Sequence, residues 1–82
     1  MKITTETNPN WTKGSDYRKT LGYKVEADNG ETYYIESANY EQTADCRFSL
    51  YKAASFSEAL ESYDCLCQAP TKAQLIDFIA TL

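Results

Sequence analysis

The sequence predicts an α+β fold, an antiparallel β-meander of four or five strands with one C-terminal α-helix packed on one face. Several short runs alternate apolar and polar residues and are separated by turn residues, which is typical of strands with one buried face. The C-terminal segment instead repeats its apolar residues at helical spacing. Because 82 residues leave room for one hydrophobic core, we expect a single domain over residues 1–82.

The clearest local pattern is a hairpin in the stretch GYKVEADNGETYYIES, centred on residues 28–30. A two-residue Asn-Gly turn would mix apolar and charged side chains on each face of this hairpin. A three-residue loop with Gly30 in the left-handed region separates them, and burial of one face selects that register. The expected pairs are then Val25 with Tyr33 and Tyr23 with Ile35.

Three further segments are predicted to be strands. Residues 2–7 are rich in β-branched side chains and predict a short edge strand, followed by a loop to residue 18. Residues 46–52 and 62–69 alternate in the same way as the hairpin strands. Residues 55–63 fit either a short helix capped by Ser55 or a loop. The expected shared core face holds Tyr23, Val25, Tyr33, Ile35, Cys46, Phe48, Leu50, Cys65 and Cys67.

The C-terminal helix is the most strongly indicated element. Pro70 ends the preceding strand, and Thr71 with Gln74 forms a capping box at the helix start. A helix this short is marginal alone in water, so we expect its apolar stripe to dock on the sheet and leave the opposite sheet face in solvent. The stripe consists of Leu75, Phe78, Ile79 and Leu82.

Cys65-x-Cys67 is the first candidate for chemistry, but its spacing favours packing. A structural zinc site needs four ligands, and the chain has three cysteines and no histidine. A redox pair usually takes the form Cys-x-x-Cys at a helix start, which is absent. We therefore expect no metal and no cofactor, with the cysteines as small core residues. A cysteine-based metal or redox protein is retained as an alternative.

The sequence also predicts a protein that is not an enzyme. Without histidine, the usual general base near neutral pH is missing. The three glycines are scattered and form no phosphate-binding loop. The carboxylates fall mostly in loops or on the predicted outer face of the sheet, where no desolvated pair is expected.

Charge is distributed unevenly along the chain. Residues 1–24 hold five bases and two acids, whereas residues 25–46 hold six acids and no base. This balance disfavours direct binding of nucleic acid. No apolar run is long enough for a transmembrane span, and the N-terminal stretch does not resemble a signal peptide, so we expect a cytoplasmic protein with reduced cysteines.

The acidic stretch and the tyrosines suggest a protein-binding surface. Tyr34 and Tyr51 are expected on the exposed sheet face and Tyr40 in an acidic loop, although tyrosine also suits a half-buried strand. The acids fit a surface that docks on a basic groove, or one that only keeps the protein soluble. The predicted partner-binding residues are Glu26, Tyr34, Glu36, Tyr40, Glu41 and Tyr51.

The resulting hypothesis is a small acidic, non-enzymatic protein-binding module. Its specific form is an inhibitor of a nucleic-acid-binding protein or nuclease complex, analogous in size and charge to the anti-CRISPR and anti-restriction proteins of phages and mobile elements. Such an inhibitor places carboxylates where a partner binds phosphates. The alternative is a structural or regulatory subunit that forms a homodimer through an exposed strand edge.

Overall fold

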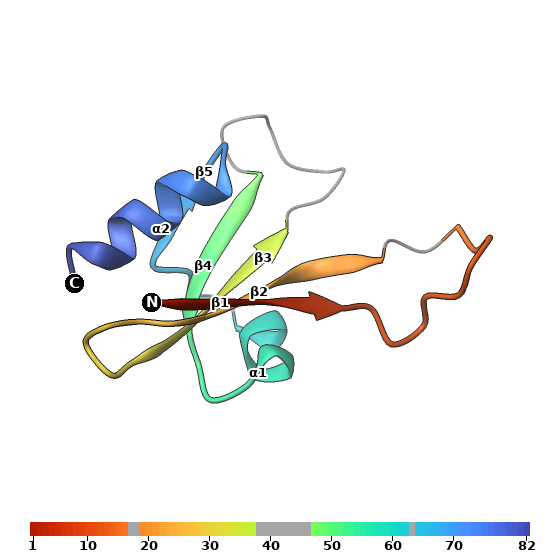
Figure 1. The fold of residues 1–82 in the computed structure, drawn as a ribbon, viewed down its shortest axis with the longest axis horizontal. Helices are drawn as coiled ribbons and strands as arrows, with labels where there is room; N and C mark the ends of the chain where they lie inside the picture. Colours follow the sequence, from red (N-terminus) through yellow and green to blue (C-terminus); the bar gives the residue numbers. More distant parts are fainter. Residues whose placement is uncertain (17–18, 38–46, 63) are drawn as a thin grey trace.

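The computed structural model describes residues 1–16, 19–37, 47–62 and 64–82. Five antiparallel strands form one sheet in the order β1-β2-β3-β4-β5, with helices on both of its faces (Figure 1). The predicted meander with a C-terminal helix is therefore confirmed. The elements are β1 (Lys2–Thr7), β2 (Thr20–Glu26), β3 (Thr32–Ser37), β4 (Phe48–Lys52), α1 (Phe56–Glu61), β5 (Cys67–Ala69) and α2 (Lys72–Ala80). Within the described residues, neither helix is long and apolar enough to cross a membrane.

The β2–β3 hairpin has the predicted register and loop. Val25 pairs with Tyr33, and Tyr23 pairs with Ile35. The Gly30 N–H donates to the Ala27 carbonyl at 3.1 Å, and Gly30 has a φ of 86°. This is a tight turn closed by a left-handed residue, which glycine adopts without a steric penalty.

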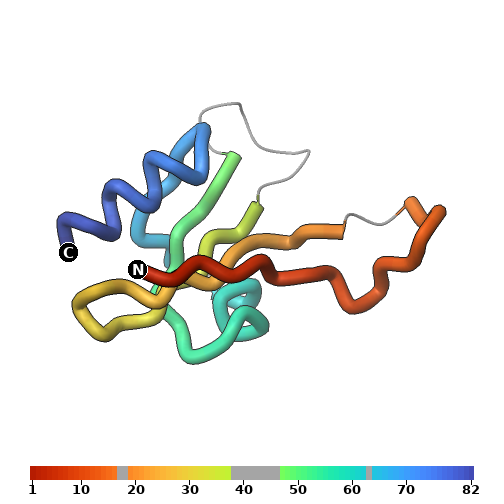
Figure 2. Tube along the Cα trace, in the orientation of Figure 1, coloured from red at the N-terminus to blue at the C-terminus, as the bar shows by residue number. Residues whose placement is uncertain are grey.

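The strand β1 forms one edge of the sheet, as predicted. Among the described strands it pairs with β2 alone, and the register shifts between Glu6 and Thr7, which face Gly22 and Thr20. The extra residue, Leu21, therefore belongs to β2, and β1 keeps a regular alternation. Figure 2 shows the chain after β1 running well beyond the ends of the central strands.

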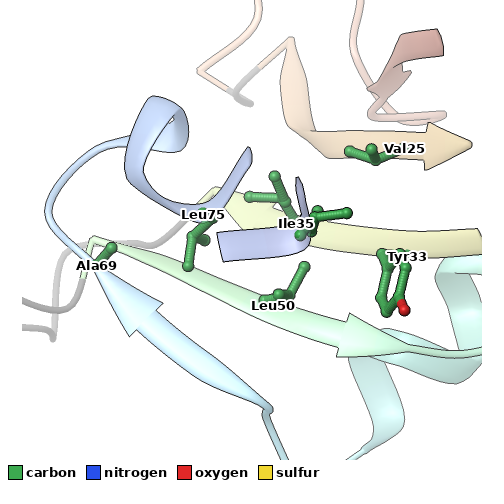
Figure 3. Packing of buried hydrophobic residues seen from close by; sticks show 7 residues of the cluster. Val25, Tyr33, Ile35, Leu50, Ala69 and Leu75 are labelled. Atoms are coloured by element: carbon green, nitrogen blue, oxygen red, sulfur yellow. The ribbon is translucent and has the colours of Figure 1, made fainter. Parts of the chain in front are cut away.

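One face of the sheet is covered by α2. Leu75 is completely buried and Ile79 is 2% exposed, and both belong to the cluster of apolar side chains on the central strands. Figure 3 shows Leu75 beside Leu50 and Ile35. The helix begins as predicted, because the Gln74 N–H donates to the Thr71 hydroxyl at 3.3 Å. Leu82 lies beyond the end of the helix and is 50% exposed, so the predicted stripe loses contact with the sheet at its last member. The buried cluster contains Val25, Tyr33, Ile35, Leu50, Ala69, Leu75 and Ile79.

The opposite face of the sheet is covered by α1, so the expectation that this face is open to solvent is wrong. The short helix is capped by Ser55, whose hydroxyl accepts a hydrogen bond from the Glu58 N–H at 3.2 Å. Phe56 and Ala59 are three residues apart and project toward the sheet, where Ala59 is completely buried. The helical interpretation of residues 55–63 is thus confirmed for 56–61.

Gly22 allows this helix to approach the sheet. A Cβ at this position would lie 3.0 Å from two carbons of the Phe56 ring and 2.1 Å from the Ile35 carbonyl oxygen. Glycine is therefore required by the close approach of neighbouring groups, and not by its backbone angles.

The two neighbouring cysteines face different clusters, which contradicts their predicted common side. Cys67 packs against the cluster under α2, and Cys65 packs against the cluster under α1. The strand β5 begins only at Cys67, and Leu66 is half exposed while its N–H donates to the Leu50 carbonyl at 2.7 Å. Strand alternation therefore does not extend back to Cys65. Cys46 lies outside the described residues.

Candidate protein-binding surface

Tyr34 and Tyr51 form the floor beneath α1. They pair directly across β3 and β4 and are 4% and 9% exposed, so the predicted exposure of these two side chains is wrong. The Tyr34 ring lies 5.9 Å from the Phe56 ring, centroid to centroid, at 44°. This tilted contact is favourable for aromatic pairs. The two tyrosines therefore hold the helix on the sheet and offer little surface to a partner.

Glu36 lies at the margin of the apolar cluster that Tyr34 and Tyr51 form beneath α1. The Tyr51 hydroxyl donates to the Glu36 Oε2 at 3.3 Å. Burial raises the pKa of Tyr51, and the negative charge of Glu36 raises it further. Tyr51 is therefore a neutral donor at physiological pH. The predicted site residue Glu36 is engaged by the protein itself through one of its two carboxylate oxygens.

A polar row crosses the sheet beside Glu36. Glu36 faces Ser49 on β4, and Ser49 faces Gln68 on β5. Ser49 is almost completely buried, and its hydroxyl accepts a hydrogen bond from the Gln68 amide at 3.3 Å. This bond compensates the burial of a polar side chain on the α1 face.

The acids at the start of the acidic stretch are compensated by bases from distant segments. Glu26 lies 4.0 Å from the Lys2 Nζ, and Glu31 lies 3.3 Å from the Lys52 Nζ. Asp28 accepts a hydrogen bond from the terminal amine of Met1 at 2.6 Å. Counting charges along the sequence missed these pairs because Met1, β1 and β4 supply the partners. Tyr40 and Glu41, also predicted to bind a partner, lie outside the described residues.

A different acidic surface is formed by α1 and the segment that follows it. We call it the α1 surface and define it by five exposed residues, Glu58, Leu60, Glu61, Asp64 and Leu66. Leu60 is 44% exposed and Leu66 is 50% exposed. Among the described residues none of its three carboxylates forms an ion pair, and no base occurs in the sequence between Lys52 and Lys72.

One of these carboxylates is fixed in position by the helix start. The Glu58 Oε2 accepts a hydrogen bond from the Ala54 N–H at 3.2 Å, and the Glu58 N–H bonds to the Ser55 hydroxyl. The reciprocal arrangement resembles a capping box and stiffens the first turn. The run of three acids without a base between residues 53 and 71 could have indicated this surface from the sequence. The surface escapes sequence reasoning because the same residues fit a helix or a loop equally well.

Groups suited to metal binding do not come together in the part of the chain that the structure describes. No group of three or more Cys, Asp or Glu side chains there could hold a metal ion. Cys65 and Cys67 are both half-buried free thiols. A hollow of about 310 Å³ lies between the N-terminus, the β2–β3 loop and the end of α2, and the carboxylate at its rim, Asp28, is already bonded to the terminal amine.

Comparison with known proteins does not assign the chain to a family. No model of a protein family matches it, and no curated protein or solved structure is significantly similar to it.

Proposed function

We propose that the protein is a non-enzymatic protein-binding module whose α1 surface docks on a basic surface of its partner. The observation that carries the proposal is the combination, on this surface, of two exposed leucines with three carboxylates that no base among the described residues compensates. Interfaces combine apolar contact with complementary charge, so the surface meets both requirements.

The scaffold beneath the surface supports the same proposal. The helix α1 is capped at its start, Ala59 is completely buried beneath it, and Tyr34 and Tyr51 pack against it from below. A surface that is ordered before binding loses less conformational entropy on association. The carboxylates would therefore be presented to the partner in a defined arrangement.

In its specific form, the partner is a nucleic-acid-binding protein or a nuclease complex, and the module inhibits it. Carboxylates carried on a rigid helix can occupy a basic groove that otherwise holds phosphates. Direct binding of nucleic acid by this chain is not part of the proposal. Association through such charges slows and weakens as salt rises, because exposed charges are screened over about 8 Å at physiological ionic strength.

The test compares two double variants that change net charge equally. Glu61→Lys with Asp64→Lys reverses charge on the α1 surface, whereas Asp16→Lys with Asp77→Lys reverses two exposed acids on other parts of the fold. Each chain, immobilised, is incubated with lysate of the source organism at low and high salt, and bound proteins are identified by mass spectrometry. Circular dichroism confirms that both variants remain folded.

We expect the natural chain and the Asp16/Asp77 variant to retain a protein with a basic groove, and the Glu61/Asp64 variant to lose it. High salt and added nucleic acid should both release that protein, since each competes for the same charges. Equal capture by both variants, or capture of acidic proteins alone, would contradict the proposal. If salt releases the captured protein but nucleic acid does not, the α1 surface remains the docking surface, and inhibition of a nucleic-acid-binding partner is rejected.

A further inference from the structure

The outer edge of β1 is the long free edge in the described sheet. At the opposite edge, β5 spans three residues and is followed at once by Pro70. By contrast β1 spans six residues, five of them exposed, and the β-bulge beside it belongs to β2. Figure 1 shows β1 along the outside of the sheet with neither helix over it. A long, regular strand edge with unpaired backbone groups is a template for another strand.

We propose that this edge pairs with β1 of a second copy of the chain, antiparallel and about a two-fold axis at Thr4. In this register Thr4 faces Thr4 of the second copy, Lys2 faces its Glu6, and Ile3 faces its Thr5. The N–H and C=O groups of every second residue of β1 point outward. In an antiparallel ladder these residues must face one another, so the numbers of two facing residues have an even sum. The register at Thr4 meets this condition.

Charge selects this register from the others that the ladder permits. Shifting the second strand by two residues places Lys2 opposite Thr4 or Asn8, and only the register at Thr4 forms two Lys2–Glu6 pairs. Opposite charges that face each other across strands stabilise the pairing, and like charges destabilise it. The sequence of β1 is therefore complementary to itself when it runs antiparallel.

The surroundings of these side chains leave them free to pair. The Lys2 side chain is 78% exposed and its Nζ lies 4.0 Å from Glu26, so a second carboxylate can approach it. Glu6 faces Gly22 within the sheet, which has no side chain to compete. On the other face of the strand, Ile3 is 42% exposed and would lie diagonal to Ile3 of the second copy, within reach across the ladder. The two sheets would join into one of ten strands.

Self-association through β1 and partner binding through the α1 surface use different parts of the chain. A variant that changes Glu6 should leave capture of the partner intact, and a variant that changes Glu61 and Asp64 should leave self-association intact. Failure of one proposal is therefore visible without affecting the other.

Sedimentation equilibrium of the full chain, from about 1 to 500 μM, tests the register through its charges. We expect a monomer–dimer equilibrium for the natural chain. Glu6→Lys should weaken the dimer about tenfold or more, because two attractive pairs become two repulsive ones. Combining it with Lys2→Glu exchanges the charges and should restore the dimer. A natural chain that is monomeric throughout, or an exchange that does not restore association, would overturn the proposal.

Cross-linking tests the register without relying on charge. Thr4→Cys places two thiols at the two-fold axis, where facing Cα atoms lie about 4.5–5.5 Å apart, within the range of a disulfide. Thr7→Cys is the matched control on the same strand, because its two copies would lie about 20 Å apart. We expect oxidation to give more covalent dimer of the Thr4→Cys variant than of the natural chain. The natural chain is the control for disulfides that the native cysteines form. Equal dimer formation by the two variants would refute the register.

Discussion

Replacing Gly22 with alanine tests whether the packing of α1 on the sheet depends on this one position. The added Cβ would lie 2.1 Å from the Ile35 carbonyl oxygen and 3.0 Å from the Phe56 ring. The oxygen belongs to the backbone of β3, so no side-chain rotation relieves the closer contact. The ring belongs to α1, so the second contact also displaces the helix.

The expected loss of stability follows from the size of the displacement. The strands must separate by more than about 1 Å at this point to restore an ordinary contact of roughly 3.5 Å. Overpacking a folded interior destabilises by about 1–3 kcal/mol, and a contact with backbone belongs at the upper end. For a domain of this size, about 3 kcal/mol corresponds to a fall in melting temperature of roughly 12–24 °C.

The assay is urea and thermal unfolding followed by far-ultraviolet circular dichroism, with Gly14→Ala as the comparison. Gly14 has a φ of 87°, and a Cβ added there would have no atom of the described residues within 4 Å, so we expect its replacement to carry mainly backbone strain, about 1–2 kcal/mol. Gly22→Ala should therefore be the more destabilising of the two. A loss below about 0.5 kcal/mol, or one smaller than that of Gly14→Ala, would refute the reasoning about the close approach.

The core beneath α2, the cap of α1 and the Tyr51 hydroxyl can each be tested by substitution. Leu75→Ala should lower the free energy of unfolding by about 2.5–5 kcal/mol in urea titrations, while Leu82→Ala, at a side chain that is 50% exposed, should stay within about 1 kcal/mol of the natural chain. Ser55→Ala should cost about 0.5–2 kcal/mol in the same assay because the Glu58 N–H loses its acceptor, and an unchanged midpoint would reject the cap. The raised pKa of Tyr51 means that the folded state retains this proton above pH 10, so stability should fall as pH rises past that value. Tyr51→Phe should fall less steeply over that window in urea titrations at successive pH values, and an identical pH dependence would contradict the assignment.

The parts of the fold that were predictable are those where one face is apolar and the other polar. In the β2–β3 hairpin a slip of one residue would bury Lys24 and Glu26, so the pattern permits one register only. In α2 the start at Thr71 and the stripe containing Leu75 indicate the same helix independently. Agreement between two local signals made these elements readable.

The packing of α1 on Tyr34 and Tyr51 was not predictable because its signals in the sequence are weak and ambiguous. Six residues are too few to establish helical periodicity, and the burial of Ala59 depends on contacts with the sheet. Tyr34 and Tyr51 are equally suited to an exposed or a buried strand face, since tyrosine carries both an apolar ring and a polar end. Because α1 covers this face of the sheet, the candidate binding surface lies on α1 and not on the sheet.

The side of Cys65 was mispredicted for a related reason. Alternation in the sequence extends over residues 62–69, but β5 begins at Cys67, and the Leu66 N–H bonds to the carbonyl of Leu50, the residue that Cys67 already faces. Two consecutive residues thus meet one residue of β4, and this irregularity interrupts the alternation before it reaches Cys65.

Because the helices α1 and α2 cover the central strands but not β1, the strands differ in how readily their backbone opens to solvent. Three consecutive residues of β3, Tyr33 to Ile35, are buried, whereas five of the six residues of β1 are exposed. Amide protons of β3 should therefore exchange with solvent only when the whole domain opens, and those of β1 should exchange through fraying that leaves both clusters in place. The strand at the free edge can detach and re-form while the rest of the protein keeps its shape.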